Sequence, residues 1–226
     1  MRLLALETSG NICSVAAVQD GKPVAVLTFA HAMQLSTRLI PFIDQVLHTA
    51  GWRMGEVDAF ATGLGPGSFT GTRVGVMTIK SFAQVHAKPV VGVCSLDVLA
   101  GEYTFIPHQV VCAVVSARKG EVYACVYEGG FEVPQPLVER AVYTPQSLHD
   151  VLLPFVGGEV VLVGHVSAEL RHALADCPVC LAPIEYPRAE TLGRLGMALL
   201  EQGHRDNPQT LIPMYLKPPA ITMPKK

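Results

Sequence analysis

The stretch of sequence that decides the fold is a glycine-rich segment between an apolar run and a long helical pattern. It reads Gly65-Pro66-Gly67-Ser68-Phe69-Thr70-Gly71-Thr72-Arg73-Val74-Gly75. Proline fixes φ and lacks an amide donor, and glycine tolerates left-handed backbone, so the Gly-Pro-Gly triplet predicts a tight turn. Ser68 is suited to be an N-cap, whose hydroxyl accepts a hydrogen bond from the first helical turn. The segment therefore predicts a turn followed by a helix over residues 68–86.

Glycines in this segment recur at a spacing of four residues. On a helix, Gly67, Gly71 and Gly75 fall on one side and leave a groove without side chains. Glycine inside a helix costs about 0.5–1 kcal/mol relative to alanine, so a closely packed neighbour is expected to offset that cost. Three neighbours satisfy this condition: a phosphate at the helix start, another helix of the same chain, and a helix of a second chain.

Length and composition predict an apolar α/β protein. The chain has 226 residues, which suits one large domain or two lobes. Only 16% of the residues are charged, against roughly 25% in an average soluble domain, which indicates an apolar core or a buried subunit interface. The net charge of −2 argues against a broad nucleic-acid surface. Glu7 interrupts the first apolar run, so we expect no membrane anchor or signal peptide and a cytoplasmic protein.

The alternation of strand and helix patterns predicts two similar units. Residues 1–104 read as three strands, a helix, a strand, a helix, a strand and a short helix, with a strong hairpin signal at Asp20-Gly21. The order restarts near residue 108 and ends with a helix over 190–203. Helix-connected strands pair in parallel through right-handed crossovers. The sequence thus predicts an α/β fold with lobes at 1–104 and 105–226, the second ending in a mobile tail at 218–226.

The glycine turn lies where phosphate-binding loops lie, but it matches no standard phosphate fingerprint. It lacks the third glycine of the dinucleotide motif and the lysine of a P-loop. Ser68 is a poor nucleophile candidate, because Pro66 and Thr70 stand where a nucleophile elbow has glycine. Residues 7–9, Glu-Thr-Ser, suit either a phosphate or magnesium site or a turn whose hydroxyls bond their own backbone. No catalytic residue is predicted.

Metal-binding patterns are equally weak. No two histidines are three or four residues apart, so a helical two-histidine site is not predicted. Cys177-Pro178-Val179-Cys180 is a lone cysteine pair, which would need His165 or His172 to complete a zinc site. We interpret it as a loop in preference to a metal or redox site.

Five segments together resemble one known family, the TsaB (YeaZ) family. They are, in chain order, Leu4-Ala5-Leu6-Glu7-Thr8-Ser9, Gly63-Leu64-Gly65-Pro66-Gly67-Ser68-Phe69-Thr70-Gly71-Thr72-Arg73-Val74-Gly75, Val93-Cys94-Ser95-Leu96-Asp97-Val98-Leu99-Ala100, Ala117-Arg118-Lys119-Gly120-Glu121-Val122-Tyr123 and Ile212-Pro213-Met214-Tyr215-Leu216. The long central glycine motif is far more diagnostic than a short glycine pattern. The match extends over nearly the whole chain.

The resemblance implies the two-lobed actin-like ATPase (ASKHA) fold, with each lobe built on a ribonuclease-H-like sheet. It implies a part in placing threonylcarbamoyl on the adenosine next to the anticodon of certain tRNAs. The implied role is a non-catalytic scaffold that activates the related TsaD subunit, with TsaE as a further partner. The resemblance also implies a homodimer in the absence of TsaD and tRNA contact mainly through the complex. No tightly bound cofactor or metal is implied, and ATP, if bound, is expected at the partner or subunit interface.

Family members pair through the two helices of the first lobe, which correspond here to about residues 35–50 and 68–86. The interface residues that this implies are Leu35, Leu39, Ile43, Gly71, Val74, Gly75, Met77, Thr78 and Ser81. Two arrangements of the second helix stay open. In the first arrangement the glycine stripe faces the partner. In the second the stripe seats the helix against its own lobe, and Val74, Met77, Thr78 and Ser81 meet the partner.

The resemblance implies that Glu7, Thr8 and Ser9 are a vestigial nucleotide-binding group. The chain departs from the family pattern at residues 35–37, where Leu-Ser-Thr replaces a histidine-serine-glutamate run, and at Ser116, which replaces an aspartate. The main alternative is an ATP-dependent transferase or kinase-like enzyme of the same fold that relies on residues 7–9. A peptidase is less favoured, because no nucleophile, base and orienting group are arranged in the sequence.

Overall fold

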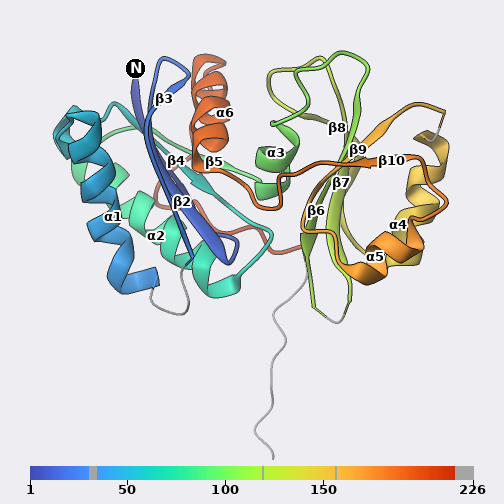
Figure 1. Cartoon of the computed structure of the whole chain (residues 1–226). Helices are drawn as coiled ribbons and strands as arrows, with labels where there is room; N and C mark the ends of the chain where they lie inside the picture. Colours follow the sequence, from blue (N-terminus) through green and yellow to red (C-terminus); the bar gives the residue numbers. More distant parts are fainter. Residues whose placement is uncertain (31–34, 119, 156, 217–226) are drawn as a thin grey trace, which may run out of the picture.

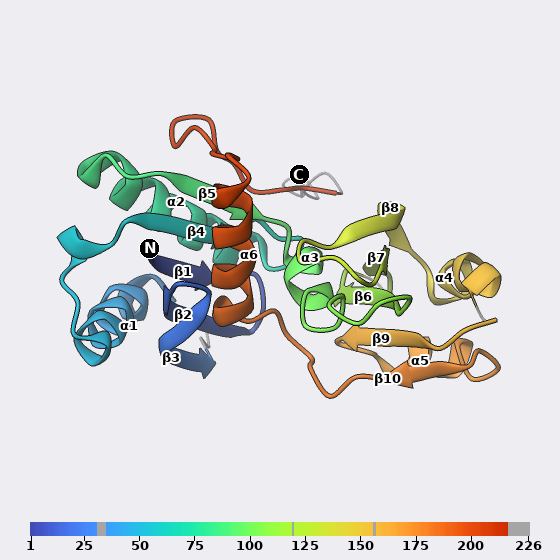
Figure 2. The same ribbon diagram turned by 90° about the horizontal axis from the view of Figure 1, so that it is seen from above.

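The chain forms two α/β lobes that lie side by side (Figures 1 and 2). The structure is a computed structural model that describes residues 1–30, 35–118, 120–155 and 157–216. Each lobe is built on a five-stranded mixed sheet, which confirms the predicted α/β class. In the described part of the chain, no helix combines the length and apolar character needed to cross a membrane. The mobile tail expected at 218–226 lies outside the described residues.

The first sheet has the strand order β3-β2-β1-β4-β5. Its strands are β1 (Arg2–Glu7), β2 (Ile12–Gln19), β3 (Lys22–Ala30), β4 (Ala59–Gly63) and β5 (Val90–Val93). β1 pairs antiparallel with β2 and parallel with β4. Asp20 and Gly21 have φ values of 50° and 77°, and a two-residue type I′ hairpin requires positive φ at both positions. The predicted hairpin is confirmed.

Two helices cover the outer face of this sheet, away from the second lobe (Figure 1). They are α1 (Leu35–Ala50) and α2 (Phe69–His86), with a short 3-10 helix, η1 (Met54–Glu56), between them in the chain. Ser68 is the N-cap of α2, and its hydroxyl accepts a hydrogen bond from the Gly71 amide at 3.2 Å. The turn, the cap and the helix predicted from the glycine segment are confirmed.

The second sheet has the order β10-β9-β6-β7-β8. Its strands are β6 (Val110–Ser116), β7 (Val122–Glu128), β8 (Gln135–Tyr143), β9 (Val160–Gly164) and β10 (Val179–Leu181). Its outer face is covered by α4 (Pro145–Leu152), η2 (Leu153–Phe155) and α5 (Ala168–Ala173). The sequence prediction missed β10, because three residues are too few to show strand alternation, and the strand begins inside the cysteine pair that was interpreted as a loop.

Two further helices lie between the sheets, and each packs on the sheet of the other half of the sequence (Figures 1 and 2). α3 (Ser95–Ala100) follows β5, but Leu96 and Leu99 belong to a core cluster with Tyr127 of the second sheet. α6 (Ala189–Glu201) follows β10, but Leu192 belongs to a cluster with Leu3 of the first sheet. Residue 104 lies between the last strand of the first sheet and the first strand of the second. α6 comes after this division in the sequence but packs on the first sheet.

Direct hydrogen bonds join α6 to the residues that directly follow α3. The Thr191 hydroxyl in α6 donates to the Glu102 carboxylate at 2.5 Å, and the Arg194 guanidinium donates to the Gly101 carbonyl oxygen at 2.6 Å. The lobes are therefore connected by packing and by polar contacts as well as by the chain itself.

Candidate functional site

The end of β1 meets the glycine segment at the edge of the first sheet. β1 and β4 are parallel neighbours, so the residues that follow them emerge at the same edge. Gly65 has a φ of 85° in the turn after β4, a backbone conformation that favours glycine. The Ser68 amide then donates to the Ser9 carbonyl oxygen at 2.6 Å. This contact fixes the start of α2 against the residues that follow β1.

The glycine stripe packs against the backbone and side chain of that same segment. A Cβ atom on Gly71 would overlap the carbonyl oxygen of Thr8, and one on Gly75 would overlap its side-chain oxygen. A Cβ on Gly67 would overlap the carbonyl oxygen of Ser9. The close neighbour is thus the segment that follows β1, which is none of the three neighbours considered from the sequence. The stripe seats α2 against its own lobe.

The polar groups of Glu7 and Thr8 are engaged within the chain. The Glu7 carboxylate is fully buried and accepts hydrogen bonds from the Ser9 amide at 2.8 Å and the Ser95 hydroxyl at 3.0 Å. Burial raises the pKa of Glu7, and the hydrogen bonds from Ser9 and Ser95 oppose that rise. The Thr8 hydroxyl donates to the Gly71 carbonyl oxygen at 2.9 Å. The residues predicted as a vestigial nucleotide group therefore hold together β1, α2 and α3.

Metal ligands do not gather in the parts of the chain that the structure describes, where no group of three or more His, Cys, Asp or Glu side chains is placed to hold an ion. Cys177 is buried, Cys180 is exposed, and both are free thiols.

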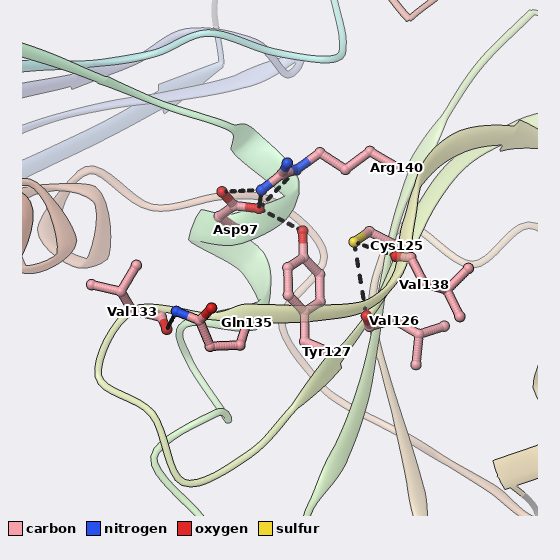
Figure 3. A network of polar contacts seen from close by, with 8 residues as sticks. All are labelled: Asp97, Cys125, Val126, Tyr127, Val133, Gln135, Val138 and Arg140. Carbon is pink, nitrogen blue, oxygen red and sulfur yellow. Dashed lines mark hydrogen bonds and ion pairs between the residues drawn. The ribbon is translucent and has the colours of Figure 1, made fainter.

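A polar network that sequence reasoning missed lies between α3 and the second sheet (Figure 3). Asp97 of α3 accepts hydrogen bonds from the Arg140 guanidinium on β8 at 2.7 and 2.8 Å, and from the Tyr127 hydroxyl on β7 at 2.6 Å. Burial, followed by the nearby Asp97 charge, raises the pKa of Tyr127 well above its ordinary value. An aspartate inside a short apolar helix was the only sequence signal for this network.

A cavity of about 180 Å³ opens beside this network, between the lobes. Asp97 and Arg140 line it together with the apolar side chains of Leu64, Leu195 and Met214. Because the aspartate neutralises the arginine, the cavity presents no net charge. Ligand pockets usually measure about 300–1,000 Å³, so this one is too small for a nucleotide.

Five of the predicted interface residues are buried inside the first lobe. Leu35, Leu39 and Ile43 are at most 4% exposed and belong to the core cluster under α1. Gly71 and Gly75 are buried against Thr8, as described above. In the chain by itself, these five residues therefore lie in the interior of the lobe and not on the outer surface of α1 and α2. An apolar stripe on an amphipathic helix has the same pattern whether it faces a core or a partner.

The remaining four predicted residues lie on the outer side of α2. Val74 and Thr78 are partly exposed, Ser81 is exposed, and Met77 is 57% exposed. Val85, which the prediction omitted, is 78% exposed. On α1, Ile40 is also exposed.

The C-terminal segment lies along α2. The Lys80 ammonium donates to the Leu211 carbonyl oxygen at 2.7 Å, and Arg73 donates to the Tyr215 hydroxyl at 2.8 Å. Arg73 also stacks over the Phe69 ring, 3.8 Å from its centroid. This segment therefore borders the exposed side of α2.

Comparisons with known proteins agree with the fold and identify a family. Residues 30–223 match the family model described as TsaD, tRNA N6-adenosine threonylcarbamoyltransferase. The tRNA threonylcarbamoyladenosine biosynthesis protein TsaB of Escherichia coli K12 is 30% identical over 228 residues, which cover 96% of this chain and 95% of that protein.

Solved structures show the same architecture. A Pseudomonas aeruginosa protein described as similar to peptidase YeaZ superposes with a TM-score of 0.81 at 26% identity, over 96% of this chain and 99% of that one. A ROK hexokinase from Thermus thermophilus superposes with a TM-score of 0.52 at 13% identity, over 90% of this chain and 99% of that one, which shows a shared fold alone. The expected two-lobed actin-like ATPase fold is confirmed. Because the TsaD model matches most of its length and TsaB of E. coli aligns with nearly all of it, the chain belongs to the TsaB (YeaZ) family of tRNA threonylcarbamoyladenosine biosynthesis proteins.

Proposed function

We propose that this chain is a non-catalytic subunit that supports threonylcarbamoyl transfer to tRNA by docking on TsaD through the outer side of α2. Family membership establishes the role in threonylcarbamoyladenosine biosynthesis. The proposal adds the mode of action. It includes a cytoplasmic location, TsaE and tRNA as partners of the assembled complex, ATP at a subunit interface, and pairing of this chain with itself when TsaD is absent.

The observation that carries the proposal is the character of the exposed side of α2. At about 100° per residue, Val74, Met77, Thr78, Ser81 and Val85 fall within an arc of roughly 100°. Their exposure, from partial for Val74 to 78% for Val85, makes this arc the outer side of the helix. None of the five carries a charge. An uncharged apolar surface of this kind is typical of a protein–protein contact.

The two hydroxyl groups in this arc already have partners. Thr78 donates to the Val74 carbonyl oxygen at 2.8 Å, and Ser81 donates to the Met77 carbonyl oxygen at 2.9 Å. Burying a hydroxyl without a hydrogen bond is unfavourable, but these hydroxyls keep their bonds inside the helix when a partner covers them. The arc can therefore be buried with little polar penalty.

The engagement of Glu7 and Thr8 supports a non-catalytic role. Both side chains are fully buried, and their hydrogen bonds go to the protein's own backbone and to Ser95. Ser68 acts as the N-cap of α2, so we do not propose that it is a peptidase nucleophile.

The test is reconstitution of tRNA threonylcarbamoylation with purified TsaD, with and without this chain. We expect TsaD to need the chain, and Met77→Glu to abolish both co-purification with TsaD and stimulation of transfer. Leu153→Glu is a matched control, because Leu153 is 49% exposed but lies on the second lobe. Circular dichroism should show that both variants fold.

Two outcomes would contradict the proposal. One is wild-type binding and stimulation by Met77→Glu, which would remove α2 from the interface. The other is turnover of ATP or transfer of threonylcarbamoyl by the isolated chain, which would favour the ATP-dependent enzyme. Calorimetry with ATP and magnesium on the isolated chain measures ATP binding, which that enzyme would require.

A further inference from the structure

The C-terminal segment, residues 206–216, is fixed to the first lobe along its length (Figure 2). It begins at the edge of β5, where the Asp206 amide donates to the Val90 carbonyl oxygen at 2.9 Å. Leu211 is then buried in the core cluster under α1 and α2. Near the end of the segment, the Met214 amide donates to the Leu64 carbonyl oxygen at 2.8 Å. These contacts hold the segment in one position on the lobe.

The end of the segment also packs on the second lobe. Met214 and Leu216 are partly buried against the core cluster that contains Tyr127 and Leu99. Met214 also lines the cavity between the lobes. The segment therefore bridges the two lobes, and a partner that binds it contacts an element attached to both.

The segment runs beside the proposed docking side of α2. Its contacts on the helix are Arg73, which donates to the Tyr215 hydroxyl, and Lys80, which donates to the Leu211 carbonyl oxygen. Arg73, Met77 and Lys80 have the spacing i, i+4, i+7, so they lie on one side of the helix. The segment thus adjoins Met77, the most exposed of the four interface residues predicted on this side of α2.

Apolar side chains stay exposed on this segment although its backbone is fixed. Ile212 is 68% exposed and Tyr215 is 42% exposed. The Tyr215 ring lies 5.5 Å from the ring of Phe69, centroid to centroid, and Phe69 is itself exposed. These side chains extend the apolar surface of α2 onto the segment. Aromatic side chains held in place by the fold are common anchors of protein–protein interfaces, because little freedom is lost when they bind.

The surface carries positive charge and no negative charge. In residues 69–81 and 209–216 the only charged side chains are Arg73 and Lys80. The Lys80 ammonium already donates to two backbone carbonyl oxygens. Arg73 uses its Nε atom on Tyr215 and stacks over Phe69, and in the described part of the chain its two terminal nitrogens make no hydrogen bond. A guanidinium held in this way can receive a carboxylate through both terminal nitrogens.

We propose that TsaD, docked on α2, also covers Ile212 and Tyr215 and places a carboxylate on Arg73. The inference rests on the proposed function, which supplies the partner, and it adds the segment, the arginine and the acidic group that the arginine binds. The occupant follows from two observations. The surface of the segment is continuous with the docking side of α2, and an apolar partner surface with one acidic group matches both the exposed side chains and the charge. A partner bound here also holds the segment that bridges the two lobes.

The experiment measures the dissociation constant of the full chain and purified TsaD by calorimetry. Ile212→Glu should raise this constant by about tenfold or more, because the interface would bury an unpaired charge. Arg73→Gln should raise it by about tenfold and make it less sensitive to salt, because the ion pair is lost.

Phe105→Glu is the matched control for Ile212→Glu. Phe105 is 65% exposed but lies in the loop between α3 and β6, so its replacement should leave the dissociation constant unchanged. Circular dichroism should show that all variants fold. In the wild type, amide hydrogen exchange of residues 209–216 should slow when TsaD is added.

The inference and the proposed function fail in different ways. If Met77→Glu abolishes binding but either Ile212→Glu or Arg73→Gln binds TsaD like the wild type, the inference is overturned and docking through α2 stands. Exchange of residues 209–216 that TsaD does not slow overturns it as well. If Met77→Glu binds TsaD like the wild type, docking through α2 fails and the inference fails with it. Binding of tRNA to the isolated chain that Arg73→Gln removes would assign this arginine to a phosphate and overturn the carboxylate.

Discussion

The hydroxyl of Thr8 donates a 2.9 Å hydrogen bond to the backbone carbonyl oxygen of Gly71, across the junction between the end of β1 and the first turn of α2. Such a contact requires the helix to approach the Thr8 backbone more closely than a side chain at residue 71 would allow. The glycine spacing is therefore a requirement of this junction. It also explains why Thr8 is buried beneath the helix.

The first prediction concerns the two glycines that contact Thr8. Gly71→Ala and Gly75→Ala should each lower the free energy of unfolding by about 1–3 kcal/mol, because the added methyl group overpacks the junction. Gly55→Ala is the control, since a Cβ at Gly55 has no neighbour within 4 Å. Urea unfolding measures all three variants.

The two glycines should respond differently to Thr8→Ala. A Cβ on Gly75 meets the Thr8 side-chain oxygen, whereas a Cβ on Gly71 meets the Thr8 carbonyl oxygen. Removing the side-chain oxygen should thus relieve Gly75→Ala and leave Gly71→Ala as unstable as before. Double-mutant cycles measure the coupling energy of Thr8→Ala with each glycine substitution. Equal coupling energies for Gly71→Ala and Gly75→Ala would show that the junction is not packed in this way.

The second prediction concerns the buried carboxyl of Glu7. Its pKa is raised from the ordinary value of 4.5, chiefly by burial. The folded state then binds the proton more tightly than the unfolded state, so the contribution of Glu7 to stability falls as the pH rises above 4.5. Gln cannot titrate, and its amide can still accept from Ser9 and donate to Ser95. The stability of Glu7→Gln relative to the wild type should therefore increase with pH.

Urea unfolding between about pH 5 and pH 8 tests this dependence. Glu159→Gln is the control. Glu159 is exposed, and in the described part of the chain only its backbone carbonyl oxygen, and not its carboxylate, accepts a hydrogen bond. The prediction is contradicted if the difference in unfolding free energy between Glu7→Gln and the wild type does not change with pH. It is also contradicted if the wild type becomes the more stable of the two as the pH rises.

The third prediction concerns the network around Asp97. Tyr127→Phe removes a hydrogen bond to a charged acceptor from a fully buried side chain, and we expect a loss of about 1.5–3 kcal/mol. Asp97→Ala should lose more, because Arg140 and the tyrosine hydroxyl are both left without this acceptor. Tyr123→Phe, on the same strand, is the control and should change stability by less than about 0.5 kcal/mol. If Tyr127→Phe and Tyr123→Phe unfold at the same urea concentration, the network contributes nothing measurable.

Local features of the fold were predictable from the sequence because the residues themselves impose them. Pro66 and its flanking glycines restrict the backbone to a turn, Ser68 caps the helix that follows, and Asp20-Gly21 adopts the positive φ values of a hairpin. The resemblance of five segments, the glycine segment among them, to one family then predicted the two-lobed fold, which the structural comparison confirmed.

Contacts between distant residues were decided only by the tertiary structure. Asp97 and Arg140 are 43 residues apart, and nothing in either local pattern relates them. The apolar stripe through Leu39 had the same spacing whether it faced the core or a partner, and only the sheet beneath α1 decided for the core. The glycine stripe likewise required a close neighbour, and only the position of β1 showed that this neighbour is Thr8. Sequence fixes which backbone conformations and which faces a segment offers, whereas the packing of sheets and helices decides what each face meets.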